Sequence, residues 1–375
     1  MSIKRRKKRK LTAFFLIFLF GFGLGIPIGL YYGSAEKADV TITMIYGSEK
    51  RAWIESLVSD FISWYSARNG GETISVNFRP MGSREMCIST ITGEIRPVIL
   101  SPASSIWLYY LNNEWNDIFG KNIINLSNKE EFIRVIYSPV IIGTWSDFNA
   151  TYKITSFDDL HDVAVKSFNL HWSHTDPRLS NSGFMGVVME VASFFKKNTS
   201  ELVLNDLLNE SLKNWMRGLE EEVEFYGKST GFLAQRAMDQ FLDVFIVYEN
   251  LIININNGVK DRKAIAIYPK DGTLLSDHPF CILKGDWVSQ KQYEAAKQFL
   301  EYLQLNSTIE KAFQYGFRPY NPNILKNSTY NNTFNSVFIP ENGLQHNIDV
   351  PIYDPNIQHD VFKYLPDLWL ITKAK

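Results

Sequence analysis

The chain has 375 residues, of which 45% are hydrophobic and 14% aromatic, and it contains two cysteines. This composition excludes an intrinsically disordered chain, a collagen-like repeat and a small disulfide-stapled protein. The 39 basic and 40 acidic residues nearly cancel, but seven of the basic residues are consecutive, at residues 4–10. Without those seven, 32 basic residues face 40 acidic ones, and this acidic remainder argues against a nucleic-acid partner.

An uncharged segment at residues 11–32 follows the basic run directly. As a helix rising ~1.5 Å per residue it would be about 33 Å long, which is enough to cross a ~30 Å hydrocarbon core. The basic flank favours the cytoplasmic side. We therefore expect a single-pass anchor in the cell membrane, with residues 1–10 cytoplasmic and the body extracellular. A cleaved signal peptide ending near residues 33–35 is the alternative, and signal-peptide cores are usually shorter, at ~7–15 residues.

Both of these alternatives export the body of the protein. Export is compatible with N-glycosylation at seven Asn-X-Ser/Thr sequons, of which roughly half are expected by chance in a chain this rich in Asn, Ser and Thr. The sequons begin at Asn125, Asn149, Asn198, Asn209, Asn306, Asn327 and Asn331. Outside the cell, Cys87 and Cys281 are either paired in one disulfide or buried separately as thiols.

Three strand, turn and helix units open the exported part. The expected strands are residues 40–46, 73–78 and 98–100, and the helices that follow them are residues 53–65, 84–92 and a segment from residue 106. This repetition predicts an α/β fold with a parallel sheet. Ser48, Ser83 and Ser105 lie in the turns, where a strand ends and a helix begins. Such positions attract anions and polar ligands, although a serine there also serves as a simple helix cap.

The middle of the chain repeats this arrangement. Further strands are expected at residues 137–145, 167–172, 243–248 and 264–268, and helices at residues 184–196 and 289–303. The segments at residues 180–183 and 226–231 provide small polar residues, including Ser182 and Thr230, just before helices. From residue 320 onward the pattern predicts an irregular tail that wraps the body and ends in a short helix.

No catalytic or cofactor motif is complete in this sequence. Residues 227–230 read Gly-Lys-Ser-Thr, but the first glycine that a P-loop requires is replaced by Glu222. His171, His174 and Asp176 are candidate metal ligands, yet residues three apart on a strand point to opposite faces, so packing or loop hydrogen bonds explain them better. We therefore expect no catalytic residue, no metal and no cofactor.

Several short segments, taken in their order along the chain, resemble the type II periplasmic solute-binding proteins of ABC import systems, in the branch of molybdate-, sulfate- and iron-binding proteins. The resemblance spans residues 40–319, and no single segment is specific by itself. The segments are residues 48–50 with Trp53, 81–86, 101–107, 180–184, 226–232, 248–250, 268–273 with 277–280, and 316–319.

This resemblance implies two α/β lobes that close around a solute. Lobe one would comprise residues 38–145 and 268–320, lobe two residues 146–260, and residues 321–375 the tail. Crossing strands would lie near residues 142–146 and 264–273. By position, the resemblance implies a ligand-binding set of hydroxyl groups with one carboxylate. These residues are Ser48, Ser83, Ser105, Ser182, Thr230, Tyr248 and Glu249.

The nature of the solute stays open. The family's oxyanion binders use hydroxyl and N–H groups, but here Glu49 and Glu249 place acids beside the expected site. A free carboxylate would repel sulfate or molybdate and favour a cation, an amine-bearing solute or a sugar. The resemblance thus implies a binder that captures a small polar solute, an oxyanion among the candidates, and delivers it to an ABC permease. The alternatives are a surface sensor or adhesion module without transport, and an enzyme using Glu49 with Glu249.

Overall fold

The computed structural model describes residues 38–166, 170–239 and 241–373. Internal contacts divide the chain into Met1–Asp39 and Val40–Lys375, and the second unit carries the helices and strands described below. No helix within the described ranges combines the length and the apolar character needed to cross a membrane. The basic segment at residues 1–10 and the expected anchor at residues 11–32 lie outside the described residues, so both stay predictions.

The first of two sheets contains the strands of the three units that open the exported part. Its strand order is β2-β1-β3-β11-β4. β1 (Val40–Gly47) runs parallel to β2 (Ile74–Met81) and to β3 (Ile99–Ser101), as predicted. β11 (Phe280–Ile282) is antiparallel to β3 and to β4 (Phe132–Ile133), so the complete sheet is mixed. No strand–helix–strand crossover leads into β11, and its direction is therefore not restricted to parallel.

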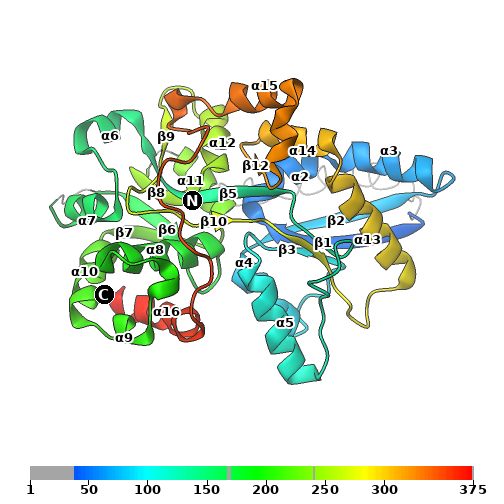
Figure 1. The fold of residues 1–375 in the computed structure, drawn as a ribbon, viewed down its shortest axis with the longest axis horizontal. Coiled ribbons are helices and arrows are strands. Elements are labelled where there is room, and N and C mark those ends of the chain that lie inside the picture. The colour runs from blue at the N-terminus through cyan, green and yellow to red at the C-terminus, as the bar shows by residue number, and fades with distance from the viewer. Residues whose placement is uncertain (1–37, 167–169, 240, 374–375) are drawn as a thin grey trace, which may run out of the picture. The chain divides into compact units, whose positions relative to one another are not determined.

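The helices of this part follow the apolar periodicity of the sequence. α13 begins at a capping box formed by Ser289 and Gln292, and it buries Ala296, Phe299 and Leu303 as predicted. Figure 1 shows α13, in yellow, beside the blue strand β1, with which it is in contact although the two lie far apart in the sequence. The helices are η1 (Ser48–Lys50), α2 (Arg51–Ser56), α3 (Val58–Arg68), α4 (Ser83–Ile91), α5 (Ile106–Phe119), α13 (Gln290–Leu303) and α14 (Asn306–Phe313).

The second sheet has the order β10-β5-β8-β6-β7, and two further strands, β9 and β12, also pair with β5. Within it, β6 runs parallel to β7 and β8, while β5 is antiparallel to β8, β9, β10 and β12. The strands are β5 (Ile136–Trp145), β6 (Trp172–Thr175), β7 (Val223–Gly227), β8 (Val244–Tyr248), β9 (Ala264–Ile267), β10 (Leu275–Ser276) and β12 (Arg318–Pro319).

Helices cover this sheet where the sequence predicts them, with shifted boundaries. The strand expected at residues 167–172 is β6, which begins at Trp172, and residues 167–169 lie outside the described residues. α8 starts earlier than expected, so Ser182 lies in its first turn. The helices are α6 (Ser146–Tyr152), α7 (Phe157–Lys166), α8 (Asn181–Phe195), η2 (Thr199–Glu201), α9 (Leu204–Leu207), α10 (Glu210–Glu220), α11 (Thr230–Met238) and α12 (Asn250–Gly258).

The two segments that the family resemblance predicts to cross between the lobes pair with each other at the long strand β5. Residues 142–145 of β5 pair antiparallel with residues 264–267 of β9. The lobe boundaries themselves stay predictions. The elements around the first sheet are called the first half of the molecule, and those around the second sheet are called the second half.

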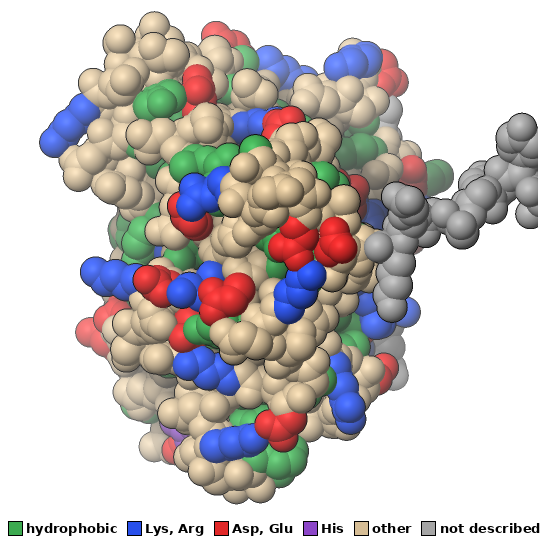
Figure 2. Space-filling model, turned by 90° about the vertical axis from the view of Figure 1, so that its right-hand side faces the viewer, with side chains coloured by type: hydrophobic (Ala, Val, Ile, Leu, Met, Phe, Trp, Pro, Cys, Tyr) green, Lys and Arg blue, Asp and Glu red, His purple; other side chains and the backbone are tan. Residues whose placement is uncertain are grey.

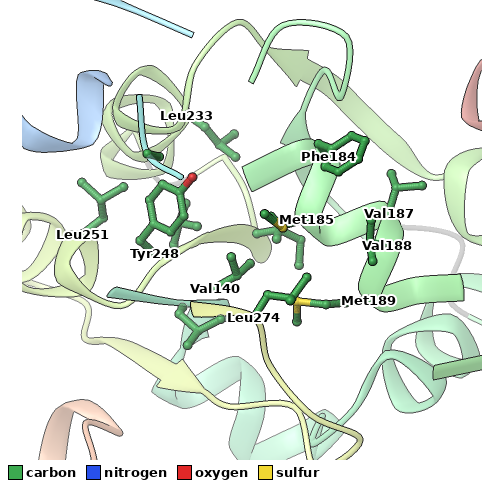
Figure 3. Close-up of a cluster of buried hydrophobic side chains, with 14 of the residues drawn as sticks. Val140, Phe184, Met185, Val187, Val188, Met189, Leu233, Tyr248, Leu251 and Leu274 are labelled. Atoms are coloured by element: carbon green, nitrogen blue, oxygen red, sulfur yellow. The ribbon is translucent and has the colours of Figure 1, made fainter. Parts of the chain in front are cut away.

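Two clusters of buried side chains form the core. One lies under the first sheet and includes Trp53, Phe61 and Phe299. The larger cluster runs through the second half and continues into the first half at α4, α5 and β11. Figure 3 shows part of it, with Tyr248 lying close to Leu251 and Val140 and with Met185 and Met189 of α8 opposite. Cys87 and Cys281 belong to this cluster as buried free thiols, which matches the second alternative for these residues.

The C-terminal segment is more regular than the sequence predicts. It contains η3 (Pro322–Lys326), α15 (Ser328–Val337), η4 (Pro340–Asn342) and α16 (His359–Thr372). Figure 1 shows the red helix α16 beside α10, and α16 also contacts α8 and α9. Its Trp369 is fully buried. α16 thus covers the second half as a packed element, because it offers an apolar face that no local partner covers.

Charged side chains of both signs are interspersed on the surface. Figure 2 views the side on which α3 and α13 lie in Figure 1, and acidic and basic groups alternate there. Ion pairs account for part of this pattern; for example, Arg68 of α3 lies 3.1 Å from Glu301 of α13. Exposed pairs of this kind contribute little to stability, about 0–1 kcal/mol each.

Candidate functional site

The first contact between the two halves is made by Ser48, at the start of η1. Its hydroxyl donates a hydrogen bond to Ser229 Oγ at 2.8 Å and accepts one from the Gly231 N–H at 2.9 Å. The expectation that Ser48 caps its own helix was wrong, because the cap position is Gly47 and, among the described residues, no side chain caps η1. A Cβ atom at Gly231 would lie 2.5 Å from the Ser48 carbonyl oxygen, so only glycine permits this close approach.

The second contact joins the start of α4 to the loop before α8. The backbone N–H groups of Arg84 and Glu85 both donate to the Leu179 carbonyl, at 3.0 and 3.1 Å. A Cβ atom at Gly82 would lie 2.4 Å from that same carbonyl oxygen and 2.9 Å from the Lys228 oxygen. The free N–H groups of the first turn of α4 are therefore satisfied by the other half of the molecule.

Buried hydroxyl groups gather behind these contacts. Ser182 Oγ lies 2.8 Å from both Thr175 Oγ1 and Thr230 Oγ1, and Ser180 Oγ lies 3.4 Å from Thr230 Oγ1. All four side chains are buried. They come from β6, the start of α8 and the start of α11, so the carboxyl ends of parallel strands bring them together, as expected for Ser182 and Thr230.

Asn181 connects this cluster to Tyr248. Its amide nitrogen donates to the Tyr248 hydroxyl at 2.8 Å and to Ser276 Oγ at 3.0 Å, while its amide oxygen accepts from Trp107 Nε1 at 2.7 Å. Burial, followed by the nearby charge of Glu49, raises the pKa of the Tyr248 hydroxyl well above its usual value. Tyr248 therefore stays protonated and is able to donate a hydrogen bond.

A buried charged cluster formed by Glu49, Lys50 and His278 lies beside Tyr248. Lys50 Nζ donates to Glu49 Oε1 at 2.9 Å and to the Pro102 carbonyl at 3.1 Å, and His278 Nδ1 lies 3.3 Å from Glu49 Oε1. The His278 ring meets the Tyr248 ring edge to face, with 5.3 Å between the ring centroids. The three side chains are at most 4% exposed.

The electrostatics of this cluster keep Glu49 ionised. Burial by itself would raise the pKa of the Glu49 carboxyl, but the Lys50 ammonium and His278 together lower it to about 2. Burial lowers the pKa of Lys50, and burial followed by the charge of Lys50 lowers the pKa of His278, which favours the neutral imidazole. Glu49 and Lys50 thus form a buried pair without net charge.

The backbone of His278 is held in an unusual conformation. Its φ angle is +38°, in the left-handed region that side chains other than glycine rarely adopt. The His278 N–H donates to the Ala103 carbonyl at 2.9 Å, and this bond fixes the turn against the β3–α5 loop. Within the part of the chain that the structure describes, the buried His278 Nε2 has no hydrogen-bond partner.

The remaining expected site residues are engaged elsewhere. Ser83 Oγ accepts a hydrogen bond from the Ala103 N–H at 2.9 Å. Ser105 donates its hydroxyl to Asp277. The structure thus brings Ser48, Ser182, Thr230 and Tyr248 together but gives Ser83 and Ser105 bonds inside the first half.

Glu249 is not a free carboxylate, contrary to the expectation from the sequence. Its Oε1 lies 2.5 Å from Arg318 Nε, and its Oε2 accepts a hydrogen bond from Tyr268. Burial raises the pKa of Glu249, and the Arg318 charge opposes this shift. This ion pair links the residue that follows β8 to β12, two segments whose proximity no local sequence pattern indicates.

A pocket of about 780 Å³ opens beside the contacts between the halves. This volume lies within the range of about 300–1,000 Å³ that is usual for small-molecule sites. Both halves line it, with Ser48, Arg51 and Gly82 on one side and Lys228, Ser229 and Gly231 on the other. Its lining combines polar groups with both signs of charge.

The candidate metal ligands lie apart. His171 is exposed and its Nδ1 lies 3.2 Å from Glu224, whereas His174 is buried against Glu220 and Asp176 pairs with Arg178. The alternation of strand faces explains this separation. Among the described residues, no group of three or more His, Cys, Asp or Glu side chains is placed to hold a metal ion.

The chain is similar to known proteins in sequence and in structure. The family model described as bacterial extracellular solute-binding protein matches residues 42–318. The sulfate-binding protein SubI from Mycobacterium tuberculosis H37Rv has a similar structure, with a TM-score of 0.57 and 17% identity, covering 84% of this chain and 94% of that one. A comparison with curated proteins finds no match.

Two further structures share the fold at low identity. The binding protein MotA from A. tumefaciens B6, in complex with glucopine, has a TM-score of 0.62 and 14% identity, covering 89% of this chain and 100% of that one. The maltodextrin-binding domain MalE from Bdellovibrio bacteriovorus, bound to maltotriose, has a TM-score of 0.62 and 13% identity, covering 89% and 94%. With the family model matching more than half of its length, this chain belongs to the bacterial extracellular solute-binding proteins and has their type II fold.

Proposed function

We propose that this protein captures a small polar solute between its two halves and delivers it to an ABC permease, while residues 11–32 anchor it to the outer side of the cell membrane. Membership of the solute-binding family supports the capture of a solute. The uncharged segment and its basic flank support the anchor. An anchored binder stays at high effective concentration near its permease.

The observation that carries the proposal is the pair of direct contacts across the halves, at Ser48 with Gly231 and at Gly82 with Leu179. A solute that touches both halves favours the arrangement in which they meet, because closure follows the difference in affinity between open and closed states. Such a role needs binding groups and no catalytic group.

The solute contacts that we propose are the convergent hydroxyl groups of Ser48, Ser182, Thr230 and Tyr248. In the structure Ser182 and Thr230 bond to each other, Tyr248 accepts from Asn181, and Ser48 bonds to Ser229, so a polar solute would exchange partners with these groups. Ser83, Ser105 and Glu249 then act as supports that hold the surrounding loops. Because Lys50 neutralises Glu49, the site does not repel an anion, and an oxyanion stays among the candidate solutes together with sugars and amines.

The test uses full-length protein purified in mild detergent. Native mass spectrometry is expected to detect a retained small solute, and that solute is expected to raise the melting temperature of stripped protein. Thr230→Val and Tyr248→Phe should each weaken binding, since each removes one hydroxyl. Thr151→Val, at an exposed position on α6, is the matched control. A protein that retains no solute, and whose melting temperature no sugar, amine or oxyanion changes, would contradict the proposal.

A further inference from the structure

A second pocket, of about 700 Å³, lies between α5 and the start of α16. It shares no lining residue with the pocket beside Ser48. Arg84 forms part of its wall, together with Tyr109 and Tyr110 of α5 and with His359, Phe362 and Lys363 of α16. The expected ligand-binding residues of the solute crevice are absent from this lining.

The guanidinium group of Arg84 provides a donor in the wall of this pocket that is unpartnered among the described residues. Its Nε and Nη1 atoms are buried and have no hydrogen-bond partner among the residues that the structure describes. Burial lowers the pKa of Arg84, and the acidic side chains of Asp367 and Asp176 counteract this shift through their charge. Asp176 is already held by Arg178, with 2.6 Å between Arg178 Nη2 and Asp176 Oδ2.

Arg84 itself is half-buried, but buried N–H groups of a cation that lack a partner are costly unless an anion reaches them. Guanidinium N–H groups match carboxylate and phosphate oxygens. The basic side chains of His359 and Lys363 line the same pocket, but Glu114 and Asp117 do so as well. Those two acids disfavour a multiply charged anion, and a single carboxylate fits the balance of charge better.

The other walls are aromatic. Tyr109 is 48% exposed, and Tyr110 and Phe362 are half-buried, so their rings offer apolar surface to an occupant. The Phe362 ring lies 5.7 Å from Tyr110 and 5.2 Å from Trp107, both on α5, and 5.0 Å from Phe184 on α8. Residues of the first half therefore meet the C-terminal helix, which is packed on the second half, at this pocket.

We propose that this pocket is a second ligand site, which binds a small monocarboxylate with an aromatic or apolar body. The carboxylate pairs with Arg84, and the body packs against Tyr109, Tyr110 and Phe362. Because α4 and α5 form one wall and α16 the other, occupation also holds the two halves together. The site lies outside the solute crevice and does not depend on the function proposed for it.

The test measures binding to full-length protein by titration calorimetry, with phenylacetate and indole-3-acetate as probes and phenylacetamide as the neutral control. The carboxylates are expected to bind and the amide to bind at least tenfold more weakly. Arg84→Gln should reduce carboxylate affinity at least tenfold. Arg96→Gln, which replaces an exposed arginine after α4, is the matched control and should leave it unchanged.

A second variant keeps the test decisive if Arg84→Gln does not fold. Lys363→Glu alters an exposed side chain on α16 and should weaken carboxylate binding several-fold. Ser48→Ala should leave carboxylate binding intact, which separates this site from the solute crevice. Equal binding of acid and amide, an unchanged affinity in both pocket variants, loss of binding in Ser48→Ala, or no binding of either probe at millimolar concentration would each overturn the proposal.

Discussion

Replacing Gly82 by alanine tests the contact between the two halves most directly. The new methyl carbon would lie 2.4 Å from the Leu179 carbonyl oxygen, which belongs to the backbone and cannot rotate away. An ordinary contact begins at 3.4 Å, so the two segments must separate by about 1 Å. The φ angle of Gly82 is −66°, which suits alanine, so backbone strain does not add to the effect.

This separation weakens the hydrogen bonds from the Arg84 and Glu85 N–H groups to Leu179. Two such bonds contribute about 1–3 kcal/mol in total. At about 1.4 kcal/mol per factor of ten, the closed arrangement should lose ~5- to 150-fold in its equilibrium with an open one. The free energy of unfolding should fall by no more than this total of about 1–3 kcal/mol, because the substitution does not change the interior of either half.

The assay is a distance measurement by pulsed electron spin resonance, with one spin label on each half. Asp286→Cys and Leu208→Cys provide exposed attachment sites, and both native cysteines are buried. Gly82→Ala should move the distance distribution to longer separations. Gly218→Ala on α10 is the matched control, since its methyl group would meet only the side chains of Val165 and His161, at 3.1 and 3.2 Å. Identical distributions for Gly82→Ala and the parent protein would refute the reasoning.

Three further substitutions probe buried groups. Glu49→Gln should lower the free energy of unfolding at pH 7. Because the pKa of Glu49 is lowered from 4.5 to about 2, the stability that its charge contributes is complete above pH 4.5 and is lost as the pH falls toward 2. Urea unfolding should therefore show that the difference in unfolding free energy between parent and variant becomes smaller below pH 4.5. Glu190→Gln should gain stability relative to the parent as the pH rises above about 4.5, the ordinary carboxyl pKa. Burial and then the Glu220 charge raise the pKa of Glu190, and a raised carboxyl pKa makes the parent lose stability as the pH rises. Phe362→Ala should lower the free energy of unfolding by about 1–3 kcal/mol, as the half-buried ring contacts Trp107 and Phe184, and calorimetric melting would measure this.

Each of these three has an outcome that contradicts it. A constant difference for Glu49→Gln between pH 7 and pH 3 would mean that the carboxylate is not held ionised by Lys50. A Glu190→Gln variant that is less stable than the parent at pH 7 would contradict the second prediction. Its comparison is Glu220→Gln, which should be destabilising throughout, because Glu220 Oε2 accepts hydrogen bonds from Tyr226 and Trp369. An unchanged melting temperature for Phe362→Ala would show that α16 does not hold the halves together through this ring.

Local patterns in the sequence predicted most of the elements correctly. Alternation and apolar runs gave β1, β5 and β8, and the 3.6-residue period gave α13 with its buried face. These predictions succeed because burial of one strand or helix face depends on neighbours within the same element. Ser182 and Thr230 were expected at the site from the family resemblance, and the structure places them side by side because parallel strands bring the starts of successive helices to one edge of a sheet.

Pairings between distant residues were beyond such patterns. Glu249 looked like a free acid at the site, and only the approach of β12 to β5 reveals Arg318 beside it. Lys50 and His278 lie in two of the segments that carry the family resemblance, but no local pattern pairs them, because the turn that places His278 next to Lys50 lies far along the chain. The use of Ser48 as a bridge to Gly231, rather than as a helix cap, likewise depends on the other half.

The sequence by itself determined the α/β class, the order of most elements, the exported character expected from its N-terminus and the likeness to a family of binding proteins. The tertiary structure alone decided which hydroxyl groups converge and which acids are neutralised. It also decided that Arg84 has buried nitrogen atoms without partners among the described residues, and that α16 closes one side of a pocket. The physical reason is that periodicity records whether a residue is buried, whereas the partner of a buried polar group is set by how separate elements pack.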